Sequence, residues 1–364
     1  MKVLSAASAL LGVSLLRFAP DTTGIKVQDY NRLPLTWDLA TSQNAISNTG
    51  NSWWSSSYIH ASNGRNYFLV SHVGNPGVGF YRYSILDIDD PSYYRQYSLG
   101  GTESDPISDH VIGANITLPT YGFQALDAGD TLQSMRTWST SGFIFDLTFN
   151  LSSAIIVNGG SGTFTWGPYL TYEWSMPAGI TTGSFVVNDT RLTIDPERSL
   201  TWYDRQLVWG AEGSAAAHNW TWFQLHFDDD DNNNNNNNAQ SGRASRKISA
   251  WIWNYEDNAR IQFATIRDIP GEQHVVPLTQ FTPGSRVWTS PDCGGPYHLD
   301  WTIALEDGTE LDIATARPDQ LFCGPTDPTP PAYEGFVTFT GVDGDGRPVS
   351  GFGLVEITLS NLDN

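Results

Sequence analysis

The sequence predicts an all-β protein made of two β domains packed together, with few helices. The chain has 364 residues, and at roughly 100 to 200 residues per domain we expect two domains, with one oversized β domain as the rival. The 34 Gly and 20 Pro are spread along the chain, which suits many short strands joined by turns. Apolar and polar residues alternate in several segments, and helical periodicity is hard to find.

The strands are expected in a definite order along the chain. Segment 218–227 alternates, with Trp220 and Trp222 on one face and Phe223 and Leu225 on the other. Segment 247–255 alternates in the same way, so we expect the two segments to pair. The Asp/Asn tract at 228–238 between them has no apolar side chain to bury, and the loop 228–243 that contains it is predicted to be disordered. Further strands are predicted at 67–73, 143–149, 162–166, 299–305, 335–340 and 351–359.

The small residues of segment 210–217 lie between two Trp-rich segments and are the expected join between the halves. This gives an N-terminal β domain at 20–210 and a C-terminal β domain at 211–364.

Composition argues against two kinds of protein. The chain contains 14 Trp, 15 Tyr and 17 Phe, and 16% of its residues are charged, so the bulk of the chain is not disordered. The formal net charge of −20 repels a phosphate backbone or an anionic lipid surface. We therefore expect no nucleic-acid partner.

The N-terminus resembles a secretory signal. Lys2 precedes an apolar stretch from Val3 to Leu16, which has the order of a signal peptide and is too short to span a bilayer. We place the signal at residues 1–19, with an approximate cut because Arg17 and Pro20 fit poorly around a cleavage site. A buried N-terminal helix is the alternative. After cleavage we expect a secreted or vesicular protein without a membrane anchor.

The glycosylation motifs and the cysteines also suit a protein of the secretory pathway. Asn-x-Ser/Thr acceptors begin at Asn115, Asn150, Asn188 and Asn219. The two cysteines of the chain, Cys293 and Cys323, should pair in an oxidising compartment and close a loop worth about 3 to 4 kcal/mol.

Common catalytic and cofactor motifs are missing. The seven histidines never form HxH or HExxH, so no metal site is indicated. There is no GxGxxG after a strand and no P-loop, and the GGSG at 159–162 lacks the spacing of a nucleophile elbow. Carboxylates are plentiful, so a glycosidase-like acid/base pair stays open, although none is singled out by an apolar setting.

Polar residues embedded in aromatic runs are the candidate functional residues. In TWYDRQLVWG (201–210), Asp204 and Arg205 follow Trp202 and Tyr203. Buried charges among rings need partners, so this cluster is either a structural latch or a site. Glu356 shares a strand face with Phe352 and Leu354 and must find a partner if both faces are covered.

Three further runs have an ordinary interpretation beside the functional one. In YEW (172–174), Glu173 is read as an outward-facing residue of an alternating strand. NSWWSSS (51–57) can line a pocket through Trp54 and Ser56 or form a Ser-rich turn. His298 in HLDW (298–301) is read as part of a solvated strand face.

Several of these runs also carry a family resemblance. TWYDRQLVWG, HNWTWFQLHF (218–227), PAYEGFVTFTG (331–341) and GFGLVEIT (351–358) come in an order that resembles the hydroxyneurosporene synthase-like, or lipocalin-like, superfamily. Together with NSWWSSSYI (51–59), they resemble its secreted fungal branch, which includes kievitone hydratase and fungal hetero-Diels-Alderases. The likeness spans about residues 51–358, and none of the motifs is a catalytic fingerprint.

The resemblance implies two lipocalin- or calycin-like β-sandwich or barrel domains with a pocket near their junction, and no cofactor. It implies an enzyme of fungal secondary metabolism acting on an apolar polyketide or terpenoid. We expect a (hetero-)Diels-Alderase that couples a dehydration-derived o-quinone methide with a terpene or polyene alkene. The alternatives are a hydratase or dehydratase of prenylated phenolics, or a non-catalytic carrier or carbohydrate-binding protein.

Roles for side chains follow from that chemistry. Dehydration needs an acid near the departing hydroxyl, a role open to Asp204, Glu173, Glu356 or His298. A donor to the oxadiene carbonyl lowers the cycloaddition barrier, and we consider Tyr203, Arg205 or an indole for it. Asp204 and Arg205 are the first choice. Aromatic rings supply rigid walls, and the expected substrate-binding residues are Trp54, Ser56, Tyr172, Trp174, Trp202, Trp222 and Trp253.

Overall fold

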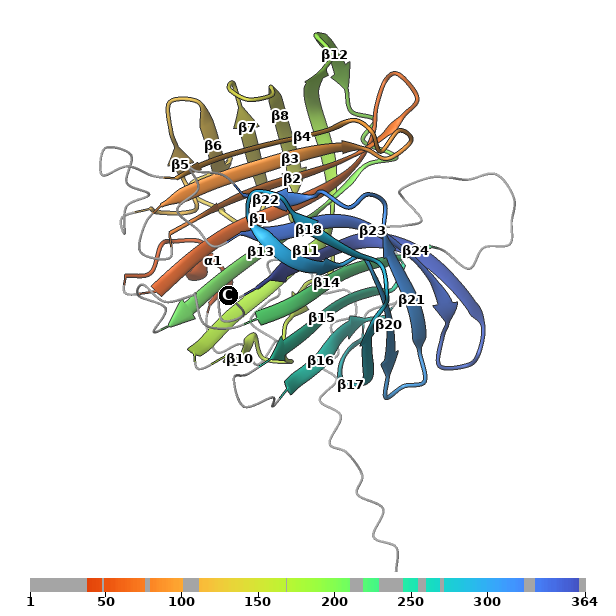
Figure 1. The fold of residues 1–364 in the computed structure, drawn as a ribbon. Coiled ribbons are helices and arrows are strands. Elements are labelled where there is room, and N and C mark those ends of the chain that lie inside the picture. Colours follow the sequence, from red (N-terminus) through yellow and green to blue (C-terminus); the bar gives the residue numbers. More distant parts are fainter. Residues whose placement is uncertain are drawn as a thin grey trace, which may run out of the picture.

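The computed structural model describes residues 38–47, 49–75, 79–100, 111–167, 169–209, 219–228, 245–254, 260–268, 272–323 and 331–359. The regular secondary structure of these residues is strand, apart from one short helix, α1 (Leu39–Ser42) (Figure 1). No helix in this part of the chain is long and apolar enough to cross a membrane. The predicted signal at 1–19, the join at 210–217 and nearly all of the Asp/Asn tract lie outside the described residues.

The N-terminal half is one strongly curved sheet of thirteen strands. Its main path runs β4-β3-β2-β1-β13-β11-β8-β7-β6-β5, and β9, β10 and β12 pair with the long strand β11. The bounds are β1 (Thr49–His60), β2 (Asn66–Gly74), β3 (Phe80–Asp87), β4 (Tyr94–Gly100), β5 (Ile116–Thr117), β6 (Tyr121–Ala125), β7 (Ser134–Ser139), β8 (Phe145–Asn150), β9 (Ile156–Val157), β10 (Thr163–Trp166), β11 (Tyr169–Val187), β12 (Thr190–Thr193) and β13 (Leu200–Trp209).

The C-terminal half is a closed barrel of eight strands. The path β21-β20-β17-β16-β15-β14-β24-β23 closes because β21 also pairs with β23. Short β22 extends the pairing of β23, and β18 and β19 form a separate hairpin. The bounds are β14 (Asn219–Phe227), β15 (Lys247–Asn254), β16 (Arg260–Arg267), β17 (Gln273–Pro283), β18 (Val287–Ser290), β19 (Gly294–His298), β20 (Asp300–Leu305), β21 (Glu310–Thr315), β22 (Leu321–Phe322), β23 (Ala332–Val342) and β24 (Pro348–Thr358).

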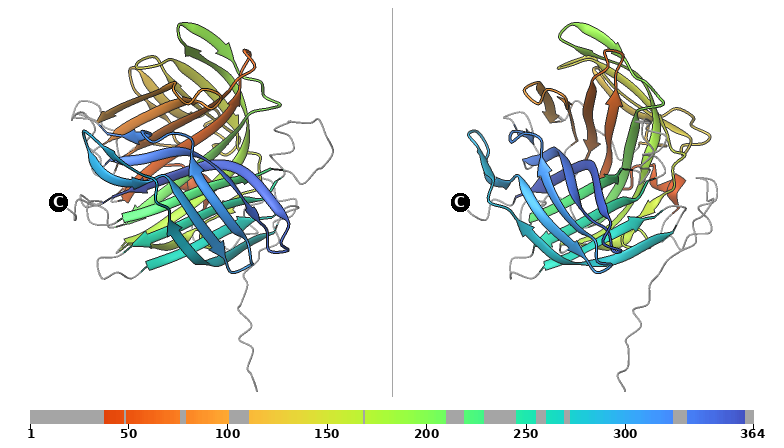
Figure 2. Two further views of the ribbon diagram at one scale, coloured as in Figure 1. Left: turned by 45° about the vertical axis from the view of Figure 1, so that its right-hand side comes forward. Right: turned by 90° about the vertical axis from the view of Figure 1, so that its right-hand side faces the viewer.

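The two halves pack through the tryptophan face of the barrel wall. On β14 and β15, Phe223 and Ala250 point into the barrel core, whereas Trp222 and Trp251 on the opposite face belong to a cluster shared with the N-terminal sheet. The strands pair antiparallel with Trp222 opposite Trp251, so alternation places the indoles between the halves. Figure 2 shows the barrel lying against the curved sheet.

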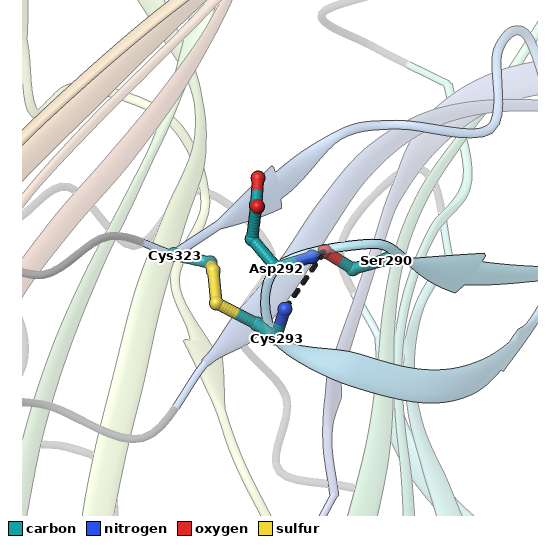
Figure 3. Close-up of a disulfide and its surroundings, with 4 residues drawn as sticks. All are labelled: Ser290, Asp292, Cys293 and Cys323. Atoms are coloured by element: carbon teal, nitrogen blue, oxygen red, sulfur yellow. Dashed lines mark hydrogen bonds between the residues drawn. A yellow bond between two sulfur atoms is a disulfide. The ribbon is translucent and has the colours of Figure 1, made fainter.

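A disulfide ties the β18–β19 hairpin to the end of β22. Cys293 and Cys323 are joined with their Cα atoms 6.4 Å apart (Figure 3). The Ser290 Oγ accepts a hydrogen bond from the Cys293 backbone N–H at 3.2 Å. The disulfide therefore fastens the β18–β19 hairpin, which lies outside the barrel, to the end of β22. Strand β22 in turn contacts β4 of the N-terminal sheet.

Candidate functional site

A cavity of about 130 Å³ lies where the curved sheet faces the barrel wall. Its indole walls come from both halves, with Trp54 on β1 and Trp166 on β10 facing Trp220 and Trp222 on β14 and Trp251 on β15. Trp222 packs edge-on against Trp54 at a centroid distance of 5.3 Å and stacks on Trp251 at 5.6 Å. These contacts fix the rings, so the walls are rigid and apolar.

Strand register brings the polar groups of the cavity together. In the curved sheet, one cross-strand row runs Arg82, His72, Trp54, Asp204 and Ser175 over β3, β2, β1, β13 and β11. Directly opposed residues of neighbouring strands project to the same face, so this row presents an arginine, a histidine, an indole and an acid to the barrel.

The barrel presents a matching row. Glu334, Glu356, Trp222 and Trp251 are opposed in sequence over β23, β24, β14 and β15. Trp54 Nε1 donates to Glu334 Oε2 at 3.0 Å, which links one row to the other across the junction of the halves.

Asp204 is a buried acid at the cavity wall. Ser175 Oγ donates to Asp204 Oδ1 at 2.5 Å. Burial raises the pKa of Asp204 to about 7, although hydrogen bonds from Ser175 and Trp202 oppose the rise. The carboxyl group therefore holds its proton through mildly acidic conditions and can donate it near neutrality.

Glu173 lies behind Asp204, fully buried on β11. Asn158 Nδ2 donates to its Oε1 at 2.9 Å. Burial, and next the charge of Asp204, raise the pKa of Glu173 well above its usual value. The prediction that Glu173 faces outward is wrong, because the strand is covered on both faces where the barrel packs on it.

Glu356 provides a second acid at the cavity. Trp220 Nε1 donates to Glu356 Oε1 at 2.8 Å. Burial raises the pKa of Glu356 to about 7, and the negative charge of Glu334 on the neighbouring strand adds to the rise. The partner that we expected for Glu356 from the sequence is therefore the indole N–H of Trp220.

Glu334 differs from the other three carboxyl groups because an arginine and a histidine lie beside it. An Arg82 guanidinium nitrogen lies 2.7 Å from Glu334 Oε1, and His72 Nδ1 lies 3.6 Å from the same oxygen. Burial acts to raise the pKa of Glu334, but Arg82 and His72 outweigh it and lower the pKa. Glu334 is therefore ionised and lies on the strand next to Glu356, behind the residues that line the cavity.

Arg205 does not pair with Asp204. Adjacent residues on β13 project to opposite faces, and Arg205 stacks over Trp53 inside the N-terminal half. Its guanidinium donates five hydrogen bonds, four to the backbone carbonyls of residues 42, 44, 52 and 206 and one to Asn51. The structural and the functional interpretation therefore each apply to one residue. Arg205 braces the N-terminal half through its hydrogen bonds, and Asp204 lines the cavity.

Other predicted site residues lie in the core of the N-terminal half. Tyr203 donates to Gln43 Oε1 at 2.6 Å, and Trp174 Nε1 donates to Ser42 Oγ at 2.8 Å. Tyr172 belongs to the same hydrophobic cluster. None of the three lines the cavity, because each is on the face of the sheet that points away from the barrel.

The remaining predicted residues divide between the junction and the far side of the barrel. Trp202 and Trp253 pack in the junction cluster behind the cavity lining. Ser56 Oγ donates to Gln224 Oε1 of the barrel at 2.8 Å. His298 lies on β19, with Nδ1 3.0 Å from the Gly284 carbonyl, and does not line the cavity. Of the predicted residues, Asp204, Glu356, Trp54 and Trp222 line it.

Sequence reasoning missed Ser52, His72, Arg82 and Glu334. Each is isolated among apolar or small residues, and no local spacing connects them. Glu334 was inside the quoted motif PAYEGFVTFTG, where an acid next to Tyr333 in an otherwise apolar run was the available signal. Within the described ranges, no group of three or more His, Cys, Asp or Glu side chains is placed to hold a metal ion.

Comparison with known proteins places the chain in a family. The AttH-like family profile matches residues 123–359, which is more than half of the chain. Kievitone hydratase of Fusarium solani subsp. phaseoli is 35% identical over 91% of this chain and 88% of its own, and dehydratase AsqC of Emericella nidulans is 33% identical over 93% of each.

Solved structures agree with this assignment. The crystal structure of kievitone hydratase from Nectria haematococca superposes with a TM-score of 0.78 at 35% identity, covering 92% of this chain and 96% of that one. An AttH protein of Nitrosomonas europaea superposes with a TM-score of 0.70 at 17% identity, covering 88% and 96%, which shows the shared fold. The named relatives are a hydratase and a dehydratase, so this chain is a hydratase- or dehydratase-like enzyme. It belongs to the AttH-like family.

Proposed function

We propose that the protein adds water to, or removes it from, an apolar aromatic small molecule bound in the cavity between its halves. The observation that carries this proposal is the placing of two carboxyl groups, the buried Asp204 and the half-buried Glu356, beside indole walls. The similarity to a hydratase and a dehydratase supports the same reaction class.

The carboxyl groups supply the acid. In dehydration, a protonated carboxyl gives its proton to the departing hydroxyl, so that water leaves instead of hydroxide. In hydration, it protonates an alkene and water adds to the resulting cation. Both pKa values are raised to about 7, which keeps a large share of the groups protonated near neutral pH.

The walls suit a positively charged or electron-poor intermediate. Indole faces attract a cation by roughly 0.5 to 2 kcal/mol each when water is displaced. A cavity of about 130 Å³ is similar in size to a cavity that accommodates a single aromatic ring. We therefore propose a substrate whose reacting ring or branched alkene enters the cavity while the rest of the molecule lies at its mouth.

The cycloaddition expected from the sequence uses the same first step. Loss of water from a hydroxymethyl-phenol or tropolone gives an o-quinone methide, which an alkene can trap. Alignment of the two partners contributes up to about 7 to 11 kcal/mol in intramolecular analogues. The Gln206 side chain lines the cavity, and its buried Nε2 has no hydrogen-bond partner among the described residues. We propose it, in place of Tyr203 or Arg205, as the donor to the oxadiene carbonyl.

The experiment uses two probe reactions with purified protein. Incubation with 2-prenylphenol tests hydration, and incubation with 2-(hydroxymethyl)phenol and limonene tests dehydration followed by trapping. A tertiary alcohol formed faster than in buffer supports the hydratase. A single stereoisomer of the adduct, where buffer gives a mixture of diastereomers, supports the cycloaddition. The same mixture as in buffer, formed faster, supports dehydration alone. No product above the buffer rate with either probe overturns the proposal.

A further inference from the structure

We propose that Ser52 and His72 form a proton-accepting pair in the cavity, separate from the carboxyl groups that donate protons. Both side chains line the cavity. His72 Nε2 lies 2.9 Å from Ser52 Oγ. This inference rests on the proposed water chemistry, and it adds the group that receives the proton the substrate gives up.

The surroundings of His72 determine which of its two ring nitrogens can accept a proton. Its Nδ1 faces the ionised Glu334 at 3.6 Å, so the ring hydrogen belongs on Nδ1 and Nε2 is left as an acceptor. Ser52 then donates its hydroxyl hydrogen to Nε2, which leaves the Ser52 oxygen lone pairs free to accept a proton from a bound molecule. Phe80 packs edge-on against the imidazole at 4.8 Å and fixes the ring plane.

Glu334 is itself held in place. Arg82 and Trp54 bind its two oxygens at 2.7 Å and 3.0 Å. A serine, a histidine and a carboxylate in this order resemble the arrangement by which a base activates a hydroxyl group. The described charged and titratable groups around the pair are Arg82 on β3, Glu334 on β23, Asp204 two strands away in the same row of the sheet, and Glu356 on the barrel wall.

The proton balance closes without a further reagent. In dehydration of a hydroxymethyl-phenol, the C–O bond breaks and a carboxyl proton leaves with the oxygen as water. The phenolic O–H gives its proton to Ser52 Oγ as the Ser52 proton moves to His72 Nε2. The products are the quinone methide, water, a carboxylate and an imidazolium, and solvent returns the proton from the imidazolium to the carboxylate. Hydration of the quinone methide runs in reverse: the carboxylate takes a proton from the attacking water, and the pair returns a proton to the phenolate oxygen.

The test separates the base from the acid by changing the leaving group. Acetate leaves without being protonated, so 2-(acetoxymethyl)phenol needs the base but not the acid. The assay follows limonene adduct above the buffer rate from this probe and from 2-(hydroxymethyl)phenol. Glu356→Gln should lose turnover of the hydroxymethyl probe and keep that of the acetoxymethyl probe. Ser52→Ala and His72→Gln should lose both by about 10²- to 10⁴-fold.

Controls guard against loss of fold. Ser52→Thr keeps a hydroxyl group and should restore part of both rates, which a purely structural role of the alanine variant would not explain. Ser184→Ala on β11 and His60→Gln at the far end of β1 are the matched substitutions away from the cavity. Wild-type turnover of the acetoxymethyl probe by Ser52→Ala and His72→Gln overturns the inference. Failure of the wild type with both probes overturns the proposed function instead.

Discussion

Replacing Glu356 by Gln separates the chemistry of this carboxyl group from its packing. The amide oxygen can still accept the 2.8 Å hydrogen bond of Trp220, but the amide has no acidic proton to give. General acids contribute typically about 10²- to 10⁴-fold. We therefore expect kcat for hydration or dehydration to fall by about that factor in Glu356→Gln.

The same substitution should stabilise the fold above neutral pH. The pKa of Glu356 is raised from 4.5 to about 7, so between these values the folded protein binds more protons than the unfolded chain, and stability falls as pH rises. The shift of two to three pK units corresponds to about 3 kcal/mol. This is an upper bound because Glu356 is half-buried and borders the cavity, where water solvates the charge.

Urea unfolding of both proteins checks the magnitude. At about pH 5 the two free energies of unfolding should differ by less than about 1 kcal/mol, and at about pH 8 the variant should be more stable by up to about 3 kcal/mol. Glu310→Gln, at an exposed position on β21, is the matched control and should change neither kcat nor the free energy of unfolding. A Gln variant that keeps wild-type kcat, or that is less stable than the wild type at about pH 8, would refute this reasoning.

Further outcomes follow from the same structure. Turnover should fall as pH rises through about 7, because the acids lose the protons they donate, and a pH–rate profile checks this. Arg205→Met leaves buried carbonyls without donors and should lower the free energy of unfolding by roughly 3 kcal/mol or more in urea titrations. Cys293→Ser combined with Cys323→Ser should lower it by about 3 to 4 kcal/mol, an effect absent if the wild type is already reduced. We propose that the chain follows the secretory route, so N-glycosidase should reduce its mass, with the exposed Asn115 and Asn188 as the first sites; an unchanged mass contradicts this.

The strands were predictable where the pattern is local. Segments 218–227 and 247–255 pair as β14 and β15, with Trp220 opposite Trp253. A period of two residues is visible within a single strand, and it correctly separates the barrel core from the tryptophan face. The expectation of an all-β chain with a barrel is confirmed by the structure and by the match to kievitone hydratase.

The partners of buried polar residues could not be read from the sequence. Asp204 and Arg205 are neighbours in the chain, yet alternation sends one to the cavity and the other into the N-terminal core. Ser52, His72 and Glu334 come from three strands, and Glu334 is 280 residues from Trp54, its hydrogen-bond partner. Their meeting depends on strand register and on the docking of the halves, and neither leaves a signal in local spacing.

The most direct test of the central claim is a carbon-13 NMR titration of the carboxyl groups in protein labelled at Glu and Asp side chains. The account predicts resonances that titrate near pH 7, one of which disappears in Glu356→Gln. Titration of every carboxyl resonance below about pH 5, as ordinary solvated acids titrate, would contradict it, because the cavity would then hold no proton to give to its substrate.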